Sequence, residues 1–185
     1  MSSHHFVKEN QEPFLFVKGN DFPIEVLNQL LEWNPSVICD QNSISYFFQN
    51  NRKADYLFLD SPSLVNIFNN LNVELVITEN KSISEKLTEF LAIKKSNYLN
   101  VVCENVVEEF NNFSKDFYSI LNVYFFDAKN KLYKNPSNNF SKWQNKGQKT
   151  SILDTNGIEI ESFTALEEGV FCFPPLHVYW ILESI

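Results

Sequence analysis

The sequence predicts an α/β protein in which a mainly parallel sheet is flanked by helices and followed by a small antiparallel β unit. Over the first two-thirds of the chain, short apolar runs alternate with stretches of helical apolar spacing, and these runs are nearly continuous. Both features are typical of parallel sheets, whose strands are covered on both faces. After Asp127 the helical spacing ends, and short strand-like runs separated by Gly and Pro predict the antiparallel unit.

Six apolar runs are expected to form the strands of the parallel sheet. They occupy residues 14–17, 37–39, 56–59, 73–77, 99–103 and 123–126. The segments between them are expected to be helical, since apolar residues recur there at helical spacing. Ser61 followed by Pro62 is typical of a helix start, and Ser82 with Glu85 is the pattern of a capping box. A further helix is expected over residues 110–121.

The chain after Asp127 has a different character. Residues 129–150 are polar and rich in lysine, and we expect them to be a solvated linker and loop. Four strand-like runs follow, at residues 151–153, 158–160, 170–173 and 178–182. We therefore expect two domains, residues 1–134 and 135–185, with the boundary near Asn135.

Composition and charge exclude several classes of function. A net charge of −8 and a pI near 4.9 argue against a general nucleic-acid-binding protein, which normally presents a basic face. No apolar run approaches the roughly 20 residues that span a bilayer, and no signal peptide pattern is present. Cys39, Cys103 and Cys172 are far apart and never spaced C-x-x-C, which fits free thiols in a reducing compartment. We expect a cytoplasmic protein that binds neither nucleic acid nor membranes.

Acidic residues at strand ends are the first candidates for chemistry. Asp40, Asp60 and Asp127 each come directly after an expected strand. In an open parallel sheet, ligands bind outside the carboxyl ends of the strands, where a pair of carboxylates could hold Mg²⁺. Aspartate is also a routine turn and capping residue at this point, so a structural role is the alternative.

No other motif in the sequence indicates a specific activity. The chain has no G-x-x-x-x-G-K-[ST] or G-x-G-x-x-G phosphate loop and no G-x-S-x-G nucleophile elbow. His4 and His5 form a pair near the start that is more typical of a surface, and His177 has no obvious carboxylate partner in sequence. Composition and spacing alone therefore define a two-part α/β protein without an assigned activity.

Several segments match, in chain order, the motifs of one enzyme family. They are residues 1–13, 37–40, 54–64, 80–86, 140–147 and 179–184. Asp60 and Ser63, for example, stand in the family's Gly-Asp-x-Asp-Ser-Leu pattern. The chain resembles the thiamine pyrophosphokinases, in particular those of the Bacteroidetes group. The resemblance implies a Rossmann-like nucleotide-binding domain, a small β-sandwich domain of the thiamine-binding type, and a homodimer with active sites shared across its interface.

The resemblance also implies an activity and a set of site residues. The family transfers pyrophosphate from ATP to the thiamine hydroxyl, giving AMP and thiamine diphosphate, and Mg²⁺ bridges the phosphates. Carried onto this chain, the catalytic positions are Asp60 and Ser63, and Asp60 and Asp40 are the metal positions. Asp40, Gly19 and Ser82 are the cofactor-binding positions, and ATP and thiamine are the expected partners.

Most remaining motif positions of the family are replaced in this sequence. The glycine and the second aspartate of Gly-Asp-x-Asp-Ser are Leu59 and Pro62, and the family's Arg and Asp-His are missing near Glu109. Fewer carboxylates weaken Mg²⁺ binding, and loss of the arginine removes a phosphate clamp. Single losses of this kind often cost about a hundredfold in rate, so we expect impaired catalysis.

Three hypotheses remain open at this point. The first is a catalytically impaired pyrophosphokinase-like protein. The second is an active kinase that has rebuilt its metal site from Asp40, Asp60, Glu79 and Glu109. The third is a non-catalytic α/β ligand-binding or interaction module that shares only the fold.

Overall fold

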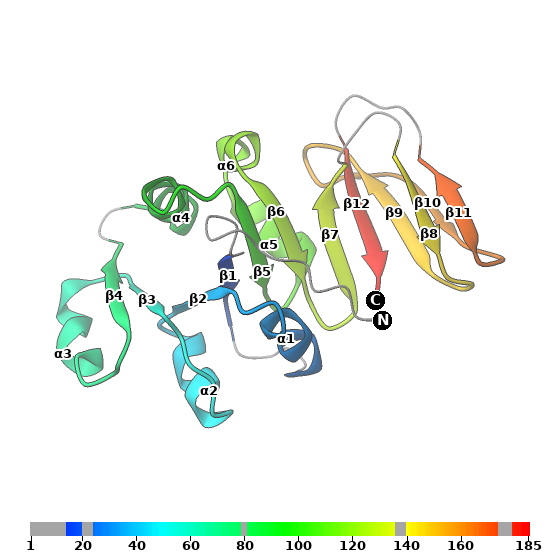
Figure 1. Ribbon diagram of the computed structural model, residues 1–185. Coiled ribbons are helices and arrows are strands. Elements are labelled where there is room, and N and C mark those ends of the chain that lie inside the picture. The colour runs from blue at the N-terminus through cyan, green and yellow to red at the C-terminus, as the bar shows by residue number, and fades with distance from the viewer. Residues whose placement is uncertain (1–13, 20–23, 79–80, 136–139, 174–178) are drawn as a thin grey trace.

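The computed structural model describes residues 14–19, 24–78, 81–135, 140–173 and 179–185. Within these ranges the chain forms a ten-stranded sheet of order β10-β9-β12-β7-β6-β5-β1-β2-β3-β4 and a two-stranded sheet, β11-β8. In Figure 1 the large sheet runs from β4 at the left to β10 at the right. Segment 1–13, Glu79 and the three histidines lie outside the described residues.

The N-terminal part of the chain alternates strands and helices, as the apolar spacing predicts. Its strands are β1 (Phe14–Val17), β2 (Ser36–Asp40), β3 (Tyr56–Leu59), β4 (Glu74–Ile77), β5 (Tyr98–Val102) and β6 (Asn122–Phe126). Its helices are α1 (Ile24–Leu31), α2 (Ser43–Gln49), the 3-10 turn η1 (Pro62–Leu64), α3 (Val65–Phe68), α4 (Ile83–Ile93), α5 (Val106–Asn112) and α6 (Lys115–Ile120). Neighbouring strands from β4 to β6 pair in parallel, so this α/β prediction is confirmed.

Helices cover both faces of the parallel strands. Successive side chains of a strand point to opposite faces, so they pack against different helices. Along β1, Phe16 packs in a cluster that α4, α5 and α6 complete, whereas Val17 packs in a second cluster completed by α1, α2 and α3. Both side chains are fully buried. Continuous apolar strands are therefore required, since neither face of this half of the sheet is left to water.

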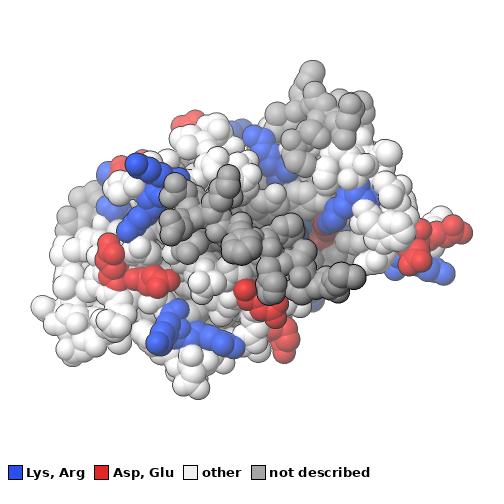
Figure 2. Space-filling model, in the orientation of Figure 1, with Lys and Arg blue, Asp and Glu red and all other residues white. Residues whose placement is uncertain are grey.

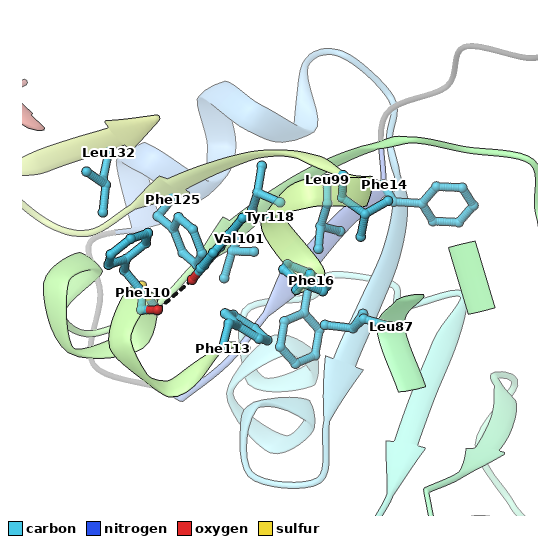
Figure 3. Packing of buried hydrophobic residues seen from close by; sticks show 14 of the residues in the cluster. Phe14, Phe16, Leu87, Leu99, Val101, Phe110, Phe113, Tyr118, Phe125 and Leu132 are labelled. Atoms are coloured by element: carbon cyan, nitrogen blue, oxygen red, sulfur yellow. Dashed lines mark hydrogen bonds between the residues drawn. The ribbon is translucent and has the colours of Figure 1, made fainter. Parts of the chain in front are cut away.

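Aromatic side chains fill the core on the face covered by α4, α5 and α6. Figure 3 shows Phe110, Phe113 and Phe125 close to Tyr118, whose hydroxyl donates a hydrogen bond to the Phe110 carbonyl oxygen at 2.5 Å. The rings of Phe110 and Tyr118 stack with centroids 4.8 Å apart. Burial strongly raises the pKa of Tyr118, so its hydroxyl stays protonated and keeps donating this bond.

The single helix expected over residues 110–121 is wrong, because the chain forms two helices there. Helix α5 ends at Asn112, and Ser114 adopts extended backbone angles before α6 begins at Lys115. The Ser114 hydroxyl accepts a hydrogen bond from the Phe117 backbone N–H at 3.4 Å and caps the second helix. The apolar spacing continues across the break because the Phe113 and Phe117 rings stack in the same cluster, with centroids 4.7 Å apart.

The C-terminal strands continue the large sheet in antiparallel fashion. They are β7 (Asn130–Lys134), β9 (Lys149–Leu153), β10 (Glu159–Thr164) and β12 (Trp180–Ser184). Strands β8 (Ser141–Gln144) and β11 (Gly169–Cys172) form the small sheet. It packs on the large sheet through Phe171, which stacks on Phe163 of β10 with ring centroids 5.9 Å apart. The predicted small antiparallel unit is thus present.

The expectation that residues 129–150 form a linker and loop is wrong, since β7 and β8 lie within them. Lys131 places its ammonium 5.0 Å from the ring centroid of Tyr124 and 5.1 Å from that of Tyr133. Lys142 forms an ion pair with the buried Glu183. Lysine stems can cover apolar surface while their charged ends reach a partner, so a lysine-rich segment can still be a strand.

Backbone pairing does not break at the expected domain boundary. Strand β7 pairs with both β6 and β12, and the Asn135 N–H donates to the Tyr179 carbonyl oxygen at 2.9 Å. Trp180 of β12 packs on Phe110, with ring centroids 4.8 Å apart. The division into residues 1–134 and 135–185 stays a prediction.

Two further features concern the chain as a whole. No helix within the described ranges has both the length and the apolar character needed to cross a membrane. Cys39 and Cys103 are buried free thiols and Cys172 is an exposed free thiol.

Candidate functional site

The candidate site lies where the strand order reverses. Strands β2, β3 and β4 extend from β1 on one side, and β5 and β6 extend from it on the other. Such a switch point leaves a crevice at the carboxyl ends of the two central strands. A cavity of about 200 Å³ occupies this position between β1 and β5. It is lined by Lys18, Gly19, Asp40, Asn42, Cys103, Glu104, Asn105, Glu108, Glu109 and Asn112.

The lining of this switch-point cavity is acidic. Four carboxylates, from Asp40, Glu104, Glu108 and Glu109, face one ammonium group, from Lys18, among the described lining residues. The formal excess is three negative charges. Figure 2 shows basic and acidic side chains interspersed over the described part of one face.

Lys18 and Glu109 form an ion pair inside the cavity. The Lys18 Nζ donates to both Glu109 carboxylate oxygens, each at 2.8 Å. The Glu109 side chain is 7% exposed and that of Lys18 is 33% exposed. Strand β1 holds the lysine in place, since the Lys18 backbone N–H donates to the Val102 carbonyl oxygen of β5 at 2.9 Å. The cation of the cavity is thus already engaged by a buried carboxylate.

Helix α5 brings Glu109 to the cavity, and its first turn is firmly capped. The Asn105 side chain accepts hydrogen bonds from the backbone N–H groups of Val107 and Glu108, at 3.0 and 3.2 Å. Asp127 accepts a third from the Val106 N–H at 3.1 Å and is itself buried. Asp127 also accepts backbone N–H groups of the turn that follows it, at 2.7 Å each. Asp127 therefore has the turn and capping role that was the alternative for a strand-end aspartate.

Gly19 lies at the end of β1, beside Glu104. Its φ is +81°, a left-handed conformation that favours glycine. A Cβ built on Gly19 would lie 2.6 Å from Glu104 Oε1 and 3.1 Å from Glu104 Cδ. The space that the missing side chain leaves is consequently occupied by a carboxylate of this chain.

Asp40 lines the cavity and also organises the turn into α2. Its Oδ1 accepts the backbone N–H groups of Asn42 and Ser43, at 3.2 and 2.7 Å. Burial raises the pKa of Asp40 above its usual value, and hydrogen bonds from Ser43 and Asn42 oppose this rise. The Ser43 hydroxyl in turn donates to the Val17 carbonyl oxygen at 2.8 Å, which ties α2 to β1.

Asp60 and Ser63 lie at the end of β3 and do not line the switch-point cavity. Asp60 Oδ2 accepts a hydrogen bond from Gln41 Nε2 at 2.7 Å, and Gln41 directly follows Asp40. The Ser63 hydroxyl lies 2.9 Å from that of Ser61, which caps the following turn as predicted. The two predicted catalytic positions are thus one strand further out than the cavity.

Ser82 lies at the start of α4, away from the cavity lining. Its hydroxyl accepts the Glu85 backbone N–H at 3.3 Å, and a Glu85 carboxylate oxygen accepts the Ser82 N–H at 2.8 Å. The Ser82 hydroxyl also donates to a Glu85 carboxylate oxygen at 2.7 Å, and this bond, together with the one from the Ser82 N–H, lowers the pKa of Glu85. The predicted capping box is confirmed, and cofactor binding by Ser82 stays a prediction.

The candidate metal positions do not form a cluster. Within the described ranges, no three His, Cys, Asp or Glu side chains gather closely enough to hold a metal ion. Glu109, one member of the rebuilt metal site considered above, is bound to Lys18 instead. Glu79, another member, lies outside the described residues.

The fold and the cavity define an open-sheet α/β protein with a crevice at its switch point. No protein-family model and no curated protein matches the sequence. Among solved structures, thiamine pyrophosphokinase from Bacillus subtilis aligns with a TM-score of 0.63 at 11% identity, over 93% of this chain and 98% of that one. The enzyme from Geobacillus thermodenitrificans aligns at 0.61 and 10%, over 93% and 97%. That from Candida albicans aligns at 0.59 and 9%, over 93% and 90%.

These likenesses confirm the resemblance to thiamine pyrophosphokinases at the level of the fold. Lys18, Glu104 and Glu108 are cavity residues that sequence reasoning missed. The signal for Lys18 and Glu104 is their place directly after β1 and just after β5, the two strands at the switch point.

Proposed function

We propose that the protein is a thiamine pyrophosphokinase-like protein in which efficient pyrophosphate transfer has been lost. One observation carries the proposal: the switch-point cavity presents four carboxylates, and its one described cation, Lys18, is bound by Glu109. ATP, like any nucleoside triphosphate, is an anion. Two like charges 4 Å apart repel by about 4 kcal/mol near a protein surface, so this lining opposes phosphate binding.

Mg²⁺ and ATP, the cofactors that the family resemblance implies, do not fit the side chains as they lie. Mg²⁺ would supply charge neutralisation between phosphate oxygens and needs octahedral oxygen ligands. Both proposed ligands already accept hydrogen bonds, Asp40 Oδ1 from backbone N–H groups and Asp60 Oδ2 from Gln41, and neither belongs to a cluster of three possible metal ligands within the described ranges. Binding of thiamine without turnover is the part of the family function that the proposal leaves to this chain.

The assembly and location of the protein belong to the same proposal. We expect a homodimer in the cytoplasm, as the family resemblance implies. In support, Trp143 and Val170 are cross-strand partners in the small sheet, and 55% and 65% of their respective surfaces are exposed. Light scattering after gel filtration tests the dimer, and a monomer at micromolar concentration would contradict it.

The assay that tests the proposed function follows AMP release from ATP, thiamine and Mg²⁺. The proposal expects release at the background rate for the purified chain. Robust release that Asp60→Ala abolishes would overturn it and favour the rebuilt active site. Thermal-shift titration with thiamine and with ATP separates a retained binding function from a module that shares only the fold.

A further inference from the structure

The switch-point cavity contains two carboxylates in the positions that a ligand anion would use. Both Glu109 carboxylate oxygens accept hydrogen bonds from the Lys18 ammonium, and Glu104 lies against the backbone of Gly19 in the space left by the absent Cβ. Close approach to a glycine backbone and a lysine ammonium are the two contacts with which proteins commonly hold phosphate groups. Side chains of this chain thus stand where phosphate oxygens would stand.

We propose that Glu109 is an internal competitor for anions, and that Lys18 is the phosphate-binding cation of the cavity that Glu109 keeps occupied. The proposal rests on the proposed function only in placing the ligand at the switch point. Bidentate geometry and burial make the pair persistent, because a carboxylate that is 7% exposed has little water to replace its partner. A phosphate that binds Lys18 must therefore compete with a carboxylate that is already in place.

Two effects can weaken anion binding in the cavity: its net negative charge, and the occupation of Lys18 by Glu109. Two glutamates of α5 allow these effects to be separated. Glu108 and Glu109 are adjacent, both line the cavity, and each contributes one negative charge. Among the described residues, the ion pair of Lys18 is with Glu109, whereas the side chain of Glu108 is exposed. Glu109→Gln removes the competing charge, whereas Glu108→Gln removes an equal charge and leaves the ion pair intact.

The test is calorimetric titration of inorganic pyrophosphate, without metal, into the wild-type chain, Glu109→Gln, Glu108→Gln and the double variant Lys18→Met/Glu109→Gln. We expect Glu109→Gln to tighten pyrophosphate binding by about tenfold or more, since a released ammonium gains a charge-assisted hydrogen bond. Glu108→Gln should tighten it by about fivefold or less, as expected for an exposed charge. The double variant should lose the gain.

Three results would overturn the proposal: equal gains in the two single variants, no gain in Glu109→Gln, or a gain that survives in the double variant. Circular dichroism melts of each variant confirm that the compared chains are folded, and Glu109→Gln is nearly isosteric. AMP release by the wild-type chain would contradict the proposed function and leave this comparison of variants unaffected. The loss of pyrophosphate transfer and the competition by Glu109 can therefore be refuted independently.

Discussion

Lys18 and Glu109 are 91 residues apart in sequence, yet the lysine ammonium contacts both oxygens of the glutamate at 2.8 Å. Lys18→Met would leave the Glu109 carboxylate buried without its partner. We expect a loss of about 2 kcal/mol in the free energy of unfolding, less than for a fully buried pair because the lysine is partly exposed.

A surface pair serves as the control for this prediction. Lys81 pairs with Glu89, and these side chains are 44% and 51% exposed, so Lys81→Met should cost less than about 1 kcal/mol. Urea denaturation of both variants gives the comparison. Equal losses would show that burial of Glu109 has no energetic consequence.

Gly19 should tolerate alanine poorly for two separable reasons. A left-handed residue other than glycine costs about 1–2 kcal/mol, and the new Cβ must also displace Glu104. Gly147 has a similar φ of +84° but nothing within 4 Å of a built Cβ. Gly147→Ala therefore measures the backbone cost alone, and Gly19→Ala should unfold at a lower urea concentration. A Gly19→Ala variant as stable as Gly147→Ala would contradict this expectation and show that Glu104 moves aside without measurable cost.

Asp40→Asn should change the dependence of stability on pH. Burial raises the pKa of Asp40 in the folded chain above the ordinary 3.8, so the folded state binds more protons than the unfolded state between these two values. The contribution of Asp40 to stability consequently falls as pH rises through that window. The stability of Asp40→Asn relative to wild type should therefore rise as the pH increases above about 3.8.

Asp154 provides the opposite case for the same measurement. Backbone hydrogen bonds, chiefly from the Ile158 N–H, lower the pKa of Asp154, so its contribution is present at neutral pH and lost in acid. Asp154→Asn should lose stability relative to wild type as pH rises. If the stability relative to wild type changed with pH in the same direction for both variants, the environments assigned to Asp40 and Asp154 would be wrong.

The two predicted domains should not unfold separately. Trp180 packs on Phe110 and Tyr118 with ring centroids 4.8 and 4.9 Å away, and β12 pairs with β7. A fragment of residues 1–134 would expose these rings, so we expect it to lack cooperative thermal unfolding. Trp180→Ala should destabilise the whole chain by about 3–5 kcal/mol in a single transition. A cooperatively folded fragment would support the boundary near Asn135 instead.

The sequence predicts the parallel strands and the capping box because their signals are local. Apolar runs and the Ser82 and Glu85 spacing need no knowledge of distant residues. The break between α5 and α6 at Ser114 cannot be recognised in the sequence, because Phe113 and Phe117 keep helical spacing across it. The ion pair of Lys18 and Glu109 is hidden for another reason: it exists only because β1 lies beside β5, which alternation alone does not fix.

Loss of efficient catalysis is tested most directly by single-turnover formation of AMP and thiamine diphosphate, with the protein in excess over ATP and with Mg²⁺ and thiamine present. The Bacillus subtilis enzyme whose fold this chain shares serves as the positive control under the same conditions. We predict product at the level of a protein-free blank for this chain and near-complete conversion for the control. Conversion of a stoichiometric amount of ATP by this chain, abolished in Asp60→Ala, would contradict the proposal that transfer has been lost.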